Sequence, residues 1–105
     1  MSALAELRWW WRWRGHRPTA SIAEAEELLA RRSENATLKT AAERDSAIAD
    51  VERLGLPVYG DPPKNWDSLA ALRAILTRTD TSARVLDAGS VPEAVILPWL
   101  SLLGY

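Results

Sequence analysis

The sequence predicts an α/β protein that is mostly helical, and three observations lead to this prediction. Apolar residues recur every three or four positions through much of the 105-residue chain, which is the spacing of amphipathic helices. A proline-rich break at 56–64 divides the chain. After it, the short apolar run at 84–90 ends at an acid and a glycine and leads into another apolar run. Helices, one strand and a further helix are expected in that order.

These breaks divide the chain into three parts. Residues 1–55 form a helical N-terminal extension, residues 56–64 a linker, and residues 65–105 the start of an α/β domain. The extension comprises a Trp/Arg-rich segment at 1–17 and helices over about 20–32 and 36–54.

Capping residues mark the ends of the expected helices. Thr19 or Ser21 caps the first helix, because both side chains accept hydrogen bonds from free N–H groups of a first turn. Gly55 stops the second helix, since glycine readily takes the left-handed conformation found after helix ends. Asn65 or Asp67 is expected to cap a third helix over about 66–77. Pro98 is expected to kink the last helix, and Gly104 to stop it.

The first 17 residues are unusual because tryptophans at 9, 10, 11 and 13 are interleaved with arginines. Three interpretations are open: tryptophans packed on the rest of the protein, an anchor at a membrane surface, or stacking on single-stranded nucleic acid. The net charge of −1 disfavours nucleic acid as a partner. The amphipathic helices also allow self-association through their apolar faces.

Composition excludes several classes of site. The chain has no cysteine, which excludes disulfides and thiolate metal sites and fits a cytoplasmic protein. Its one histidine, His16, makes neither a multi-histidine metal centre nor a Ser-His-Asp triad. No metal ligands or catalytic residues are therefore assigned. No apolar run has the roughly 18 residues needed to cross a bilayer.

The expected functional site lies where the strand at 83–88 meets the last helix. Asp87 then stands at the carboxyl edge of a sheet, where α/β proteins bind ligands. Gly89 leaves room for a ligand beside the backbone, and a helix beginning near Val91 directs free N–H groups at the same place. A carboxylate beside such donors suits a zwitterionic ligand.

The run Val85 to Ser90, set between two helices, resembles motif I of the class I S-adenosylmethionine-dependent methyltransferases. The segment Pro63 to Leu69 is similar to the entry segment of several such enzymes. The resemblance implies a Rossmann-like sheet flanked by helices and S-adenosylmethionine as cofactor. It also implies that Asp87 and Gly89 lie against the methionine part of the cofactor, with Ala88 and Ser90 supplying backbone groups.

The sequence departs from the family pattern at two places. Val91 and Glu93 stand where the family has its second and third glycines, and the sequence reaches Tyr105 before the acid that ends the second strand. We therefore expect a truncated, methyltransferase-like chain that is inactive as 105 residues, with a methyl acceptor that the sequence does not indicate. The alternative is a non-enzymatic helical interaction module whose Trp/Arg-rich N-terminus meets a membrane surface or a partner.

Overall fold

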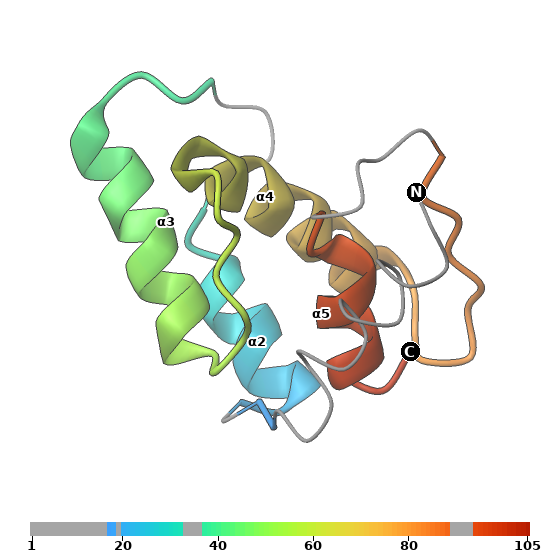
Figure 1. Cartoon of the computed structure of the whole chain (residues 1–105). Helices are drawn as coiled ribbons and strands as arrows, with labels where there is room; N and C mark the ends of the chain where they lie inside the picture. The colour runs from blue at the N-terminus through green and yellow to red at the C-terminus, as the bar shows by residue number, and fades with distance from the viewer. Residues whose placement is uncertain (1–16, 19, 33–36, 89–93) are drawn as a thin grey trace.

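The computed structural model describes residues 17–18, 20–32, 37–88 and 94–105, and the regular secondary structure in these ranges is helical. Among the helices of these ranges the central one is α4, which packs against each of the other three (Figure 1). The helices are α2 (Ile22–Leu29), α3 (Ala41–Arg53), α4 (Pro62–Arg78) and α5 (Ile96–Leu102).

Two helices begin with the same reciprocal cap. At α2 the Ser21 hydroxyl accepts a hydrogen bond from the Glu24 N–H, and the Glu24 carboxylate accepts one from the Ser21 N–H. Thr40 and Glu43 repeat this arrangement at α3. Each cap satisfies N–H groups that have no partner within the helix. Of the two residues expected to cap the first helix, Thr19 and Ser21, it is Ser21 that forms the cap.

Glycine ends α3 as the sequence predicts. Gly55 has φ +69°, its N–H donates to the Glu52 carbonyl, and the N–H of Leu56 donates to the Val51 carbonyl. This is the Schellman arrangement, which requires the left-handed conformation after the last helical residue. Gly104, with φ +105°, ends α5 in the same way.

The third helix begins differently from the prediction. Helix α4 starts at Pro62 after Asp61, whose side chain makes no cap, and proline fits there because first-turn N–H groups lack helical partners. Asn65, expected as a cap, is instead fully buried. Its Oδ1 accepts from the Tyr59 N–H at 2.8 Å, and its Nδ2 donates to the carbonyls of Tyr59 and Pro62, both at 3.1 Å. The side chain therefore fastens the preceding segment to α4.

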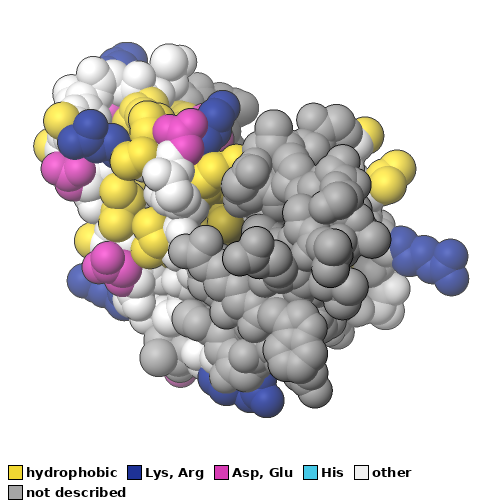
Figure 2. Space-filling model, viewed as in Figure 1, with side chains coloured by type: hydrophobic (Ala, Val, Ile, Leu, Met, Phe, Trp, Pro, Cys, Tyr) yellow, Lys and Arg dark blue, Asp and Glu magenta, His cyan; other side chains and the backbone are white. Residues whose placement is uncertain are grey.

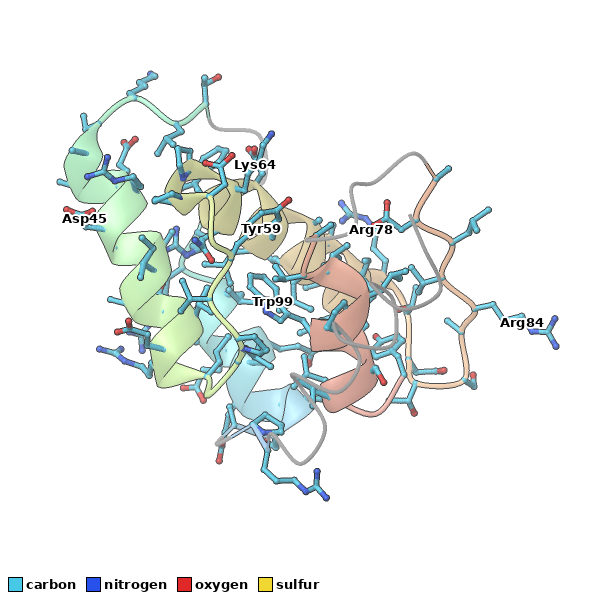
Figure 3. The ribbon with its side chains drawn as sticks, in the orientation of Figure 1. Asp45, Tyr59, Lys64, Arg78, Arg84 and Trp99 are labelled. Carbon is cyan, nitrogen blue, oxygen red and sulfur yellow. The ribbon has the colours of Figure 1, made fainter. Side chains whose placement is uncertain are left out.

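A single core joins the four helices of the described residues. Trp99 of α5 is completely buried near its centre, and its indole Nε1 donates to the Pro57 carbonyl at 2.7 Å (Figure 3). The part of the chain expected as a linker thus supplies an acceptor inside the protein. Pro98 lies in the first turn of α5, which begins at Ile96, rather than at a kink inside a longer helix. The core includes Ala25, Leu29, Ala47, Val51, Leu69, Leu72, Leu76 and Leu100.

The predicted α/β fold, with its helix-strand-helix unit of a Rossmann-like sheet, is wrong for the described residues, where no strand is found. Residues 84–88 have no regular secondary structure. A strand satisfies its backbone groups by pairing, and no second strand is present in these ranges. The expected cover is also missing, because Leu86 is 89% and Val85 36% exposed.

Within the ranges that the structure describes, no helix is both long and apolar enough to cross a membrane.

Candidate functional site

The predicted cofactor loop is only partly within the described residues. Asp87 and Ala88 are the last two residues of the segment 84–88, which runs as a coil along one side of the molecule (Figure 1). The Asp87 side chain is half-buried, whereas Ala88 is exposed. Gly89 and Ser90 lie outside the described residues. That these four residues together bind a cofactor therefore stays a prediction.

The backbone of this coil is open to other molecules. No hydrogen bond is found from or to the main chain of residues 84–88 among the described residues. Arg84 projects away from the protein into solvent (Figure 3). These N–H and C=O groups, which no described residue pairs, lie beside the exposed Leu86 and suit a ligand or another extended chain.

A tight turn sets where the coil leaves α4. The Asp80 carboxylate accepts hydrogen bonds from the hydroxyl and the N–H of Ser82, and the Ala83 N–H donates to the Asp80 carbonyl. The Ser82 hydroxyl, and then the Ser82 N–H, lower the pKa of Asp80, because both stabilise its ionised form. Next to this turn, the hydroxyls of Thr79 and Tyr105 are hydrogen-bonded at 2.9 Å, which joins the end of α4 to the segment that follows α5.

A cavity of about 590 Å³ lies elsewhere, among α2, α3 and α4. We call it the interhelical groove. Side chains at the end of α2 and along α3 border it, and α4 contributes Trp66 and Ala70. The bordering residues of the first two helices and their connection are Leu28, Arg31, Arg32, Thr37, Ala42, Glu43, Ser46, Asp50 and Arg53. No sequence motif indicates this groove, since its residues come from three separate segments.

An ion pair connects two sides of the interhelical groove. Both Nε and Nη2 of Arg32 donate to Asp50 Oδ2, at 3.0 and 2.7 Å. Both side chains are mostly shielded, with 16% and 19% exposure, so the pair is screened less by solvent than an ordinary surface pair. It joins the segment that follows α2 to α3.

The surface over α3 and the start of α4 mixes side-chain types, and Figure 2 shows apolar groups bordered by basic and acidic ones. Among the described residues, no group of three or more histidine, aspartate or glutamate side chains is arranged to hold a metal ion.

Comparisons of the chain with protein-family models, curated proteins and solved structures give no significant match.

Proposed function

We propose that this chain is a methyltransferase-like protein that binds S-adenosylmethionine through the segment containing Asp87, and that these 105 residues alone do not transfer a methyl group. The amino group of the cofactor's methionine part pairs with the Asp87 carboxylate. Ala88, Gly89 and Ser90 supply backbone N–H groups to its carboxylate. The absence of cysteine fits action in the cytoplasm.

One observation carries the proposal: the chain around Asp87 is accessible and its backbone is uncommitted. The main chain of residues 84–88 makes no hydrogen bond with any other described residue, so a ligand does not have to displace one of these residues. The segment also lies between two helices that are anchored in the core, α4 and α5.

The proposal separates binding from catalysis. Binding needs the carboxylate and neighbouring N–H groups, whereas methyl transfer also needs an acceptor held in line with the methyl group. None of the described residues is assigned that second role. We therefore expect cofactor binding without turnover.

Equilibrium dialysis with labelled S-adenosylmethionine tests the proposal. We expect saturable binding that Asp87→Ala weakens by about tenfold or more, which corresponds to about 1.4 kcal/mol or more. Asp45→Ala is the matched control, because Asp45 is an exposed carboxylate on α3 and lies outside the segment. Absence of saturable binding, or equal loss in both variants, contradicts the proposal. Transfer of a labelled methyl group above a no-protein control contradicts the expected inactivity.

A helical interaction module is the second candidate, and the all-helical structure of the described residues favours it. The Trp/Arg-rich segment 1–17 would supply the contact with a membrane surface, and all of it except Arg17 lies outside the described residues. Co-sedimentation with anionic liposomes tests this candidate. It predicts binding that is lost when Trp9, Trp10, Trp11 and Trp13 are replaced by alanine. Equal sedimentation of the parent chain and the variant without these four tryptophans contradicts this candidate.

A further inference from the structure

The coil at 84–88 begins with an arginine that is open to large molecules. Arg84 is exposed and projects away from the protein (Figure 3). The two residues after it are accessible as well, since Val85 is 36% and Leu86 89% exposed. Proteases of the trypsin type recognise such an arginine, because a charged pocket in the enzyme holds the side chain that precedes the bond to be cut.

The backbone around Arg84 is also suited to a protease. A peptide bound in a groove as an extended strand uses its main-chain N–H and C=O groups. Helical segments offer these groups only after local unfolding, whereas chain with few hydrogen bonds and contacts opens at little cost. Residues 84–88 have no regular secondary structure, and their main chain makes no hydrogen bond with any other described residue. The Arg84–Val85 bond is therefore accessible without the loss of a helix.

The Asp80 turn lies on the N-terminal side of this bond. Its hydrogen bonds from Ser82 to the Asp80 carboxylate are exposed to solvent. Thr81 and Ser82 are exposed too, and none of these residues belongs to the core. A protease that opens this turn to bind the chain before Arg84 therefore uncovers no core residue.

Other basic residues of the described ranges precede bonds that are better protected. Arg17 is followed by Pro18, whose ring removes the N–H and fixes φ. The bond after Arg31 leads into Arg32, whose N–H donates to the Leu29 carbonyl and whose side chain pairs with Asp50. Helices α3 and α4 contain Arg44, Arg53, Lys64, Arg73 and Arg78.

From these differences we propose that the Arg84–Val85 bond is a processing site for an arginine-specific protease of the trypsin type. The reaction is hydrolysis, with water as the second reactant. The peptide C–N bond breaks, Arg84 ends in a carboxylate, and Val85 begins a new chain with an ammonium group. The proposal does not rest on cofactor binding at Asp87.

The cut protein stays folded as two pieces. The piece that begins at Val85 carries α5, where Trp99 is completely buried and donates to the Pro57 carbonyl at 2.7 Å. The hydrogen bond between the hydroxyls of Thr79 and Tyr105 also joins the two pieces. Hydrolysis after Arg84 removes none of these contacts, so the second piece remains bound to the first.

Limited digestion of the full chain with an arginine-specific protease tests the proposal, with the products identified by intact mass. We expect the bond after Arg84 to be cut about tenfold or more faster than the bonds after Arg31 and after every arginine of α3 and α4. Cuts before Pro18 give other masses and are counted separately. Gel filtration should show the two pieces eluting together. Equal or faster cutting within α3 or α4 overturns the proposal, and separation of the pieces overturns the two-piece form.

Arg84→Lys checks that this side chain directs the cut. The arginine-specific protease should no longer cut after residue 84, whereas a lysine-specific protease should now cut there. The same lysine-specific protease should spare the bond after Lys64 in the parent chain, because Asn65 is fully buried. Arg44→Gln is the matched control, since Arg44 lies on α3, and it should be cut after Arg84 as fast as the parent. Equal slowing in both variants, or no cut of Arg84→Lys by the lysine-specific protease, refutes the assignment.

Discussion

Replacing Asn65 by alanine should reveal how much the chain depends on one buried amide. The side chain is fully buried and makes three hydrogen bonds, two with Tyr59 and one with the Pro62 carbonyl. A net contribution of about 1 kcal/mol for each bond gives about 3 kcal/mol. Alanine is the better helix former and recovers about 0.5 kcal/mol. Partial access of water to Tyr59 brings the expected loss to about 2 kcal/mol.

Such a loss is large for a domain of this size. Stabilities of small domains are about 5–15 kcal/mol, and about 2 kcal/mol lowers Tm by about 10 °C. Thermal and urea unfolding, followed by circular dichroism, measure the change. Ser68→Ala is the control, because Ser68 is on the same helix and makes no side-chain hydrogen bond among the described residues. If the free energies of unfolding of Asn65→Ala and Ser68→Ala differ by less than about 0.5 kcal/mol, the Asn65 amide does not fasten the segment before α4 to that helix.

Three further predictions follow from single positions. Gly55→Ala should destabilise the protein by about 1–2 kcal/mol in urea unfolding, because φ is +69° there; an unchanged midpoint would exclude the left-handed turn. Leu86→Ser should change the free energy of unfolding by less than about 0.5 kcal/mol, since Leu86 is 89% exposed. Leu72 is fully buried, so Leu72→Ala should lower the free energy of unfolding by about 2–5 kcal/mol. Similar losses in the two variants would place Leu86 in a core. The pKa of Asp80 is lower in the folded chain than in the unfolded chain, so its ionised carboxylate stabilises the fold at any pH above the unfolded value. This stabilisation is lost as the pH falls through the folded value. Asp80→Asn should therefore be less stable than the parent at pH 7 and equally stable below the titration of Asp80, and a difference independent of pH would exclude the bond with Ser82.

The sequence predicted the local features of the fold and missed those that depend on distant partners. The Ser21 cap and the Gly55 stop are encoded within a few neighbouring residues, so each can be recognised in isolation. Asn65 was misassigned because its partner is the carbonyl and N–H of Tyr59, where the chain turns into α4. The two prolines at 62 and 63 were the available signal that α4 begins earlier.

The strand at 83–88 could not be decided from its own residues. Val85 and Leu86 have the apolar character of a buried strand, yet a strand exists only when a neighbour accepts its backbone hydrogen bonds. The candidate site divides in the same way. The site expected at Asp87 and Gly89 rests on a local sequence pattern and stays a prediction, whereas the interhelical groove brings together residues from three helical regions that share no local pattern.

The central claim is that the described chain is a four-helix protein in which residues 84–88 are an unpaired coil. Backbone chemical shifts and amide hydrogen exchange, measured by NMR on the same sample, test it most directly. We predict random-coil shifts and fast exchange at Val85 and Leu86, alongside helical shifts and slow exchange at Leu72 and Leu76 in α4. Extended-strand shifts with protected amides at 84–88, together with cross-strand contacts, would contradict the claim.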